Sequence, residues 1–175
     1  MAGLLQEDGR GPAEPDAVTL LLRDAVPADI PVLLRLTRAL AAHEGQPERV
    51  TATEDDLRRA FFGAPPAAAA LIAERDGVPV GYAAWTFRFR MYTGRSLMHL
   101  TTVFVEKAGR GQGIGRAIFA DLARRALAAG CDRLEWGVKD DNMAAIAFYD
   151  RLGAETATGA RRCYLDGEAL RGLAA

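Results

Sequence analysis

The 175-residue sequence lacks the features on which several functional classes depend. Its two cysteines, Cys131 and Cys163, stand far apart without metal-binding spacing, and each is interpreted as a small buried apolar residue in a reducing compartment. No apolar run approaches the roughly 20 residues that a membrane-spanning helix needs. Residues 1–17 lack the basic start and apolar core of a signal peptide. These absences predict a cytoplasmic protein with no membrane segment, whose residues 1–17 form a disordered tail.

Charge of one sign is not in excess either. Lys and Arg total 22 against 23 for Asp and Glu, which gives a formal net charge of -1 and argues against a nucleic-acid partner. Three neighbouring arginines, Arg88, Arg90 and Arg95, form either a local anion site or a solvated face. The sequence shows no recognisable Ser-His-Asp set and no zinc spacing. Hydrolytic and metal-dependent functions are therefore not expected.

Hydrophobic residues make up 50% and charged residues 26% of the chain, the balance of a soluble globular protein. The length suits one domain, for which we predict the bounds 18–175. Period-two and β-branched runs predict strands at 18–22, 69–74, 80–89, 96–105 and 134–138, and two short strands within 155–165. Apolar periodicity with end signals predicts helices from Pro27 to near Gly45, from Thr53 to near Phe62, from the loop at 110–115 to Ala129, from Asn142 to Leu152, and after Asp166.

The segment Arg110-Gly111-Gln112-Gly113-Ile114-Gly115 carries the strongest functional signal. It follows a predicted strand and opens a helix, whose free N–H groups and positive dipole end would form a cradle for a diphosphate. Arg110 and Arg116 would add positive charge at its edge. The alternative interpretation is a tight strand-to-helix turn that uses glycine for its shape alone. The Lys-Ser/Thr ending of a nucleoside-triphosphate loop is missing, which argues against that class.

Two segments together resemble the GNAT superfamily of N-acetyltransferases. The loop at 110–115 is similar to the pyrophosphate loop Arg/Gln-x-x-Gly-x-Gly/Ala of that family, and the run from Asn142 to Ala154 is similar to its Asn-x-x-Ala-x-x-Phe-Tyr-x-x-Leu-Gly-Phe/Ala segment. Within the family, Leu134-Glu135-Trp136 and Asp55-Asp56-Leu57 point to the group of spermidine/spermine and thialysine acetyltransferases. The resemblance implies an α/β fold of the α+β type, with a mixed central sheet of about seven strands and helices on both faces.

The resemblance also implies acetyl-CoA as the cosubstrate. The backbone N–H of Val105 would polarise the acetyl carbonyl, and a neutral amine would attack it directly. Tyr149 would be the general acid that protonates the departing thiolate, although an aromatic residue packed in the core is the alternative. The residues that the family pattern assigns to the coenzyme are Phe104, Val105, Arg110, Gly111, Gln112, Gly113, Ile114, Gly115, Arg116, Asn142, Phe148 and Tyr149.

The general base and the acceptor site are less defined. Polyamine-acetylating relatives carry Leu-Glu-Asp where this chain has Leu100-Thr101-Thr102, so a strongly cationic polyamine is not the expected substrate. By period-two alternation His99 lies on the face of Thr101 and Val103, where an imidazole would accept a proton directly or through water. A packed or surface histidine is the alternative. Further candidates for the acceptor site are His43, Glu44, Thr101 and Glu135, with a solvated helix end or a cross-strand pair to arginine as the alternatives.

The predicted function is acetyl transfer to a primary amine of a small molecule, such as an amine or an amino-acid-like compound. A protein or peptide N-acetyltransferase would share the coenzyme site and need an open acceptor groove. A degenerate sensor that binds acyl-CoA without turnover is the alternative from another class, because the Glu-Asp pair is missing. The group that the chain resembles implies a homodimer, with the run from Arg161 to Leu165 as the interface.

Overall fold

The computed structural model of the protein describes residues 18–157, 163 and 165–174. The chain forms two compact units, residues 1–137 and 138–175, and each is described by itself. The predicted disordered tail at 1–17 lies outside the described residues, and the prediction of one domain at 18–175 stays a prediction. Of the helices in the described ranges, none combines the length and the apolar character needed to cross a membrane.

The first unit is built on a mixed sheet of five strands in the order β1-β2-β3-β4-β5. Neighbouring strands are antiparallel from β1 to β4, whereas β4 and β5 are parallel. This confirms the mixed sheet that the sequence predicts. The strands are β1 (Leu20–Asp24), β2 (Ala69–Arg75), β3 (Val78–Arg90), β4 (Arg95–Val105) and β5 (Leu134–Glu135).

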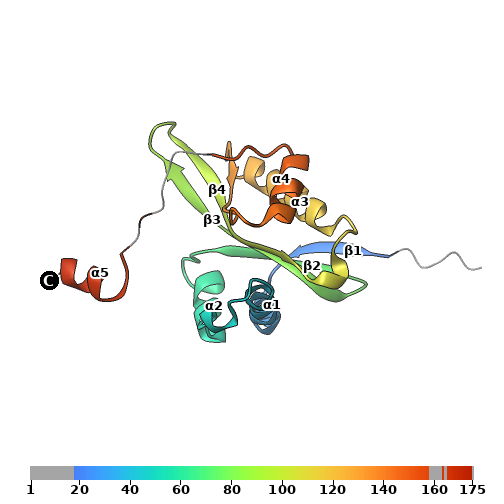
Figure 1. Cartoon of the computed structure of the whole chain (residues 1–175), viewed down its shortest axis with the longest axis horizontal. Helices are drawn as coiled ribbons and strands as arrows, with labels where there is room; N and C mark the ends of the chain where they lie inside the picture. The colour runs from blue at the N-terminus through green and yellow to red at the C-terminus, as the bar shows by residue number, and fades with distance from the viewer. Residues whose placement is uncertain (1–17, 158–162, 164, 175) are drawn as a thin grey trace, which may run out of the picture. The chain divides into compact units, whose positions relative to one another are not determined.

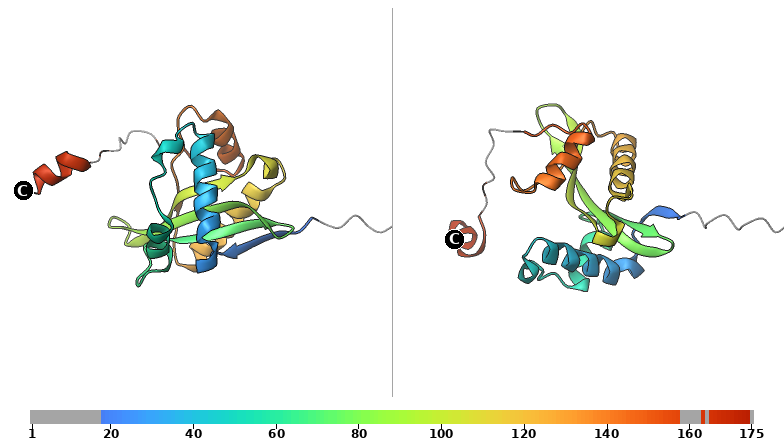
Figure 2. Two further views of the ribbon diagram at one scale, coloured as in Figure 1. Left: turned by 90° about the horizontal axis from the view of Figure 1, so that it is seen from below. Right: turned by 45° about the vertical axis from the view of Figure 1, so that its right-hand side comes forward.

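Helices cover both faces of this sheet, as predicted. α1 (Ile30–His43) and α2 (Glu54–Phe62) lie on one face and α3 (Ile114–Ala128) on the other (Figure 1). The side views show that α1 lies across the strands (Figure 2). Its apolar stripe buries Ile30, Leu33 and Leu36 against side chains of β2 and β3, among them Ile72 and Tyr82. Short 3-10 helices at Pro27–Asp29, Pro47–Arg49 and Lys107–Gly109 complete the first unit.

Two sets of hydrogen bonds hold α1 and α2 in place. The predicted cap of α2 is present, because Thr53 Oγ1 accepts from the Asp56 N–H at 3.2 Å and the Asp56 carboxylate accepts from the Thr53 N–H at 2.9 Å. Arg23 on β1 donates to both carboxylate oxygens of Asp29, at 2.6 and 2.8 Å, and to Glu74 on β2. These hydrogen bonds hold the pKa of the buried Asp29 carboxyl below its usual value. The network ties the start of α1 to the sheet.

A β-bulge in β4 overturns one predicted side-chain direction. Ala84 pairs with Thr102 and Trp85 pairs with Leu100, so Thr101 is an extra residue in β4. His99 pairs with Thr86 and Val103 pairs with Ala83, which places these two β4 residues on opposite faces of the sheet. The expectation that His99 shares a face with Val103 is therefore wrong, because one inserted residue reverses the alternation beyond it.

The second unit contains α4 (Met143–Arg151) and α5 (Gly167–Leu173). The Asn142 side chain accepts from the Ala145 N–H at 3.1 Å and caps α4. The prediction of seven strands is not met, since the described residues hold five. Residues 158–162 and 164 of the last two predicted strands lie outside the described residues, and 155–157, 163 and 165 are not in strands.

The two cysteines differ in exposure. Cys131, which follows α3, is buried as predicted, and burial raises the pKa of its thiol. Cys163 is exposed, so the expectation that it is a buried apolar residue is wrong. Leu165, two residues further along, is exposed as well, so the described residues around Cys163 do not form a buried apolar stripe.

Candidate active site

The glycine loop between β4 and α3 adopts the conformation that its sequence requires. Gly111 and Gly113 have φ values of 77° and 80°, in the left-handed region that side-chain-bearing residues rarely adopt. Gly113 is the N-cap of α3, and the first hydrogen bond of the helix runs from the Ala117 N–H to the Gly113 carbonyl at 2.9 Å. Within the described part of the chain, no backbone N–H from 111 to 116 donates a hydrogen bond. The loop thus offers consecutive donors at a positive helix end.

The Arg110 side chain connects this loop to β4 and α1. Its Nε donates to the Val105 carbonyl at 2.9 Å, and its Nη1 lies 3.1 Å from His43 Nε2 at the end of α1. The guanidinium also lies 5.7 Å from the centre of the Phe104 ring. The structure therefore brings together Phe104, Val105 and Arg110 of the predicted coenzyme site with His43 of the predicted acceptor site.

The other loop side chains have separate positions. Gln112 Nε2 donates to the Ala108 carbonyl at 2.8 Å, and its carbonyl oxygen accepts from Arg75 on β2. Gln112 therefore braces the loop with its side chain, which leaves its backbone N–H for an anion. Ile114 is buried in the core, and Arg116 is exposed at the start of α3.

The outer edge of β4 is open beside the loop. The Glu106 N–H donates inward to the Val80 carbonyl at 2.9 Å, so by strand alternation Val105 and Val103 direct their N–H and C=O groups to the opposite edge. β5 pairs with β4 at Met98 and His99 alone, and no other strand of the described residues pairs with this edge. An open edge of this kind binds an extended ligand that carries amide groups.

A polar cluster lies on β3, β4 and β5 near the bulge. Glu135 Oε1 lies 3.6 Å from His99 Nδ1 and 3.8 Å from Arg88 Nη1. The His99 side chain is 13% exposed, whereas Glu135 is 40% exposed. His99 and Thr102 share the face that α1 covers, because their partners Thr86 and Ala84 are two residues apart on β3. Glu135 thus has the cross-strand pairing that was its alternative interpretation.

Tyr82 is a buried residue next to the bulge that the sequence analysis did not single out. Its buried hydroxyl lies 2.9 Å from Thr37 Oγ1, which itself donates to the Leu33 carbonyl at 2.8 Å, so the phenol is the donor to Thr37. Thr102 also hydrogen-bonds the phenol, and burial raises the phenol pKa. Glu44 lies near enough to raise this pKa further by its charge. The signal in the sequence is Thr37, a hydroxyl residue within an otherwise apolar helix.

Three predicted site residues, Asn142, Phe148 and Tyr149, belong to the second unit. The rings of Phe148 and Tyr149 lie 5.4 Å apart on α4. Tyr149 is half-buried, and burial raises the pKa of its phenol. The phenol is therefore protonated at neutral pH, as a general acid must be. Its place beside the coenzyme loop stays a prediction.

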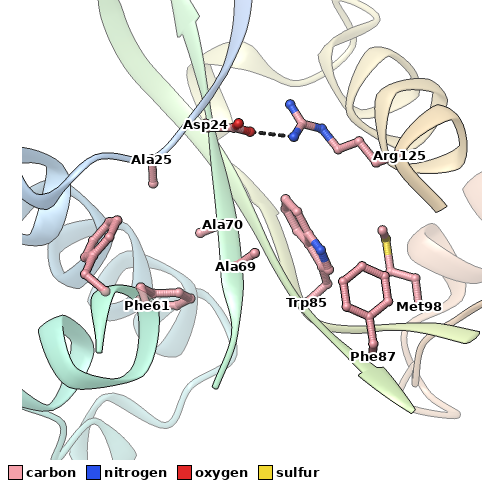
Figure 3. A pocket seen from close by; sticks show the side chains of 10 residues that line it. Asp24, Ala25, Phe61, Ala69, Ala70, Trp85, Phe87, Met98 and Arg125 are labelled. Atoms are coloured by element: carbon pink, nitrogen blue, oxygen red, sulfur yellow. Dashed lines mark hydrogen bonds and ion pairs between the residues drawn. The ribbon is translucent and has the colours of Figure 1, made fainter. Parts of the chain in front are cut away.

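The first unit contains a cavity of about 400 Å³, and none of its lining residues is a predicted site residue. Figure 3 shows its apolar lining from α2, β2 and β3, with the Asp24–Arg125 ion pair at one end. Arg125 also lies 5.6 Å from the centre of the Trp85 ring. A smaller cavity of about 270 Å³ adjoins Gln112 and Ile114. Across residues 18–157, 163 and 165–174, no three His, Cys, Asp or Glu side chains gather to hold a metal ion.

These features define a class of protein. A cradle of N–H donors at a helix N-terminus, next to an open strand edge with outward N–H groups, suits a ligand that joins a diphosphate to an amide-containing arm. The chain belongs to the Acetyltransferase (GNAT) family, whose model matches residues 35–154, and it is an N-acetyltransferase. The family implies acetyl-CoA as the cosubstrate.

Individual relatives agree with this assignment. The chain is 36% identical over 166 residues to the thialysine N-epsilon-acetyltransferase of Bos taurus, which covers 89% of this chain and 97% of the relative. It is 32% identical over 140 residues to the spermidine/spermine N(1)-acetyltransferase-like protein 1 of Homo sapiens, which covers 76% of this chain and 20% of the relative. The integron cassette protein VCH_CASS6 of V. cholerae has a similar fold, with a TM-score of 0.75, 23% identity and coverage of 89% and 97%.

Proposed function

We propose that this protein transfers the acetyl group of acetyl-CoA to a primary amine of a small molecule. The observation that carries the proposal is the open edge of β4 at Val103 and Val105, beside the unoccupied donors of the loop at 111–116. Relatives named for thialysine and for spermidine/spermine support a small amine as the acceptor. The exposed groups around Thr101 and Glu135 line the side from which such an amine would approach.

Backbone N–H groups of the loop and of β4 would bind acetyl-CoA. Backbone N–H groups from 111 to 116 would hold the pyrophosphate, and the outward edge of β4 would hold the amide-containing arm. Acetyl-CoA supplies an acyl group activated as a thioester. The Val105 N–H would stabilise the negative charge that develops on the acyl oxygen, for which one such donor typically contributes about 3–4 kcal/mol. Arg110 fixes this end of β4 through the Val105 carbonyl.

Proton transfer would use two residues, a general acid and a general base. The amine nitrogen forms a bond to the acyl carbon, the C–S bond breaks, and Tyr149 gives its proton to the sulfur. The raised pKa of Tyr149 keeps this proton available at neutral pH. His99, beside Glu135 at 3.6 Å, would accept the proton of the attacking amine directly or through water. His43 and Glu44 would line the acceptor side at the end of α1.

Release of CoA from acetyl-CoA, followed with a thiol reagent, tests the proposal. We expect turnover with free primary amines and little with peptides, and calorimetry should show acetyl-CoA binding in the micromolar range or tighter. Turnover on peptides alone would support a protein N-acetyltransferase instead. Binding without CoA release from any amine would support an acyl-CoA sensor, and the absence of binding would overturn the coenzyme site.

We also propose that the protein is a cytoplasmic homodimer. The proposed interface, the run from Arg161 to Leu165, lies largely outside the described residues. The support is the resemblance to the polyamine group and, for the compartment, the absence of a cysteine framework. Sedimentation at micromolar concentration should give twice the 18.8 kDa chain mass, and an 18.8 kDa species alone would contradict a stable dimer.

A further inference from the structure

His43, the last residue of α1, contacts the coenzyme end of β4 through the side chain of Arg110. Nη1 of Arg110 lies 3.1 Å from His43 Nε2, and Nε of the same guanidinium donates to the Val105 carbonyl at 2.9 Å. The centre of the Phe104 ring lies 5.7 Å from the guanidinium carbon and 6.4 Å from the centre of the imidazole. One arginine therefore joins the end of α1 to the strand edge at which the thioester would bind.

The contact between Arg110 and His43 requires a neutral imidazole. A guanidinium keeps its proton in proteins and has no acceptor, so Arg110 can only donate. His43 Nε2 must then carry a lone pair, and the proton of the neutral ring lies on Nδ1. When the ring takes up a second proton, both of its nitrogens become donors and its charge repels the guanidinium. The hydrogen bond therefore exists only while His43 is uncharged.

The groups around His43 come from its own helix and from three other elements. The loop contributes Arg110, whose charge favours the neutral ring, and β4 contributes Phe104, which has no charge. On α1 the next residue is Glu44, whose charge favours the imidazolium. The 3-10 helix at Pro47–Arg49 carries one acidic and one basic residue. Among the described residues, Arg110 is the one side chain that hydrogen-bonds the His43 ring.

We propose that His43 is a positioning residue for the coenzyme, because its neutral ring holds Arg110 on the Val105 carbonyl and its protonation releases Arg110. The N–H and C=O of Val105 point to the same open edge of β4, so Arg110 occupies the acceptor and leaves the donor for the acyl group. Acetyl-CoA binding should therefore weaken as pH falls through the range in which histidine changes charge, about pH 8 to 5. This role rests on the proposed coenzyme site and is separate from any contact of His43 with the amine.

Calorimetry of acetyl-CoA binding to the full chain without an amine, from about pH 8 to about pH 5.5, tests this role. His43→Gln supplies an amide oxygen that accepts from Arg110 and does not titrate. Its dissociation constant should match that of the wild type at the alkaline end. At the acid end the wild type should bind about fivefold more weakly than His43→Gln, a small effect for a charged hydrogen bond because the pair is exposed. Comparing the two proteins at each pH cancels the titration of the coenzyme's own phosphate.

Two further variants serve as controls. His43→Phe keeps a ring beside Phe104 but has no acceptor, so it should bind acetyl-CoA about fivefold more weakly than His43→Gln at every pH. Arg35 also joins α1 to the end of β4, by donating to Glu106 at 2.6 Å, but this contact includes no histidine. Arg35→Gln should therefore keep the pH dependence of the wild type.

Two results would overturn the role of His43. One is an equal loss of affinity at acid pH in the wild type and in His43→Gln, and the other is a His43→Phe variant that binds as tightly as His43→Gln at every pH. Both are measured without an amine, so they leave the proposed acetyl transfer in place. An enzyme that binds acetyl-CoA but turns over no amine would instead overturn the proposed function and leave the role of His43 intact.

Discussion

The two halves of β4 differ in how many neighbouring strands they pair with. In the first half of β4, Met98 and His99 lie between β3 and β5, and Met98 is fully buried, with its N–H bonded to the Arg133 carbonyl at 3.0 Å. From the bulge at Thr101 to Val105 the strand keeps β3 alone as a paired neighbour within the described residues. The first half is paired on both edges, and the second has outward N–H groups at Val103 and Val105 that are available to a ligand.

Removal of the Val105 N–H should have the largest effect on activity and tests whether the two halves of β4 differ in function. Val105→Pro removes an N–H that faces the open edge, where a strand tolerates proline. We expect kcat to fall by about 100- to 1000-fold, as for loss of one oxyanion donor. In contrast, Met98→Pro removes a bonded N–H in the buried half and should prevent folding. Circular dichroism and CoA-release kinetics would separate the two outcomes, and a fully active Val105→Pro would contradict the role of this N–H.

Removal of the proposed acid should have the next largest effect. Tyr149→Phe deletes a hydroxyl whose pKa burial raises, and kcat should fall by about 100-fold, the lower range for general acid catalysis. The dissociation constant of acetyl-CoA should change little, because the ring remains. Steady-state kinetics with calorimetry would check this, with Tyr92→Phe on the exposed hairpin as the control. An unchanged kcat would remove Tyr149 from the mechanism.

A pair of glycine variants sharpens the role of the loop. Gly113→Ala and Gly130→Ala both place a side chain at a left-handed φ, of 80° and 73°, at opposite ends of α3, and neither new Cβ meets an atom within 4 Å. Each should cost about 1–2 kcal/mol of stability. Only Gly113→Ala should weaken acetyl-CoA binding, by about tenfold, because the strain disturbs the donors at 111–116. Equal affinities of the two variants in calorimetry would argue against the cradle.

The smallest expected effect is a loss of stability at the start of α1, where Asp29 ties the helix to the sheet. Asp29 has a lowered pKa in the folded state because Arg23 donates to it, so its contribution to stability is present above the unfolded value of about 3.9 and is lost as pH falls through the folded pKa. Asp29→Asn should cost about 2–3 kcal/mol at pH 7. Denaturant titrations should show the difference from wild type shrinking below about pH 4. A difference that stays constant down to pH 2 would contradict the assignment.

Short sequence patterns predicted the features that depend on a few neighbouring residues, such as helix ends and tight turns. The cap at Thr53, the end of α3 and the left-handed turn at Gly111 and Gly113 each depend on a few adjacent residues. The bulge at Thr101 could not be read from alternation, because it is set by the pairing of β4 with β3. It reversed the face of Val103 relative to His99.

The sequence also could not predict contacts between residues that are far apart in the chain. The contact of Arg110 with His43 and the Tyr82–Thr37 bond depend on how α1 packs on the sheet, which no local pattern contains. The spacing of Arg88 and Glu135 likewise follows from the parallel pairing of β5 with β4. The sequence could therefore name candidate residues for the site but not the contacts that they make.

The most direct test of the account is an amide NMR titration of the full chain with acetyl-CoA. We predict that the N–H signals of residues 111–116, together with those of Val103 and Val105, shift first and most, because these donors face the ligand. Met98 and the residues of the first half of β4 should shift little. Shifts centred on the cavity near Phe61 and Phe87, with the loop unchanged, would contradict the central claim.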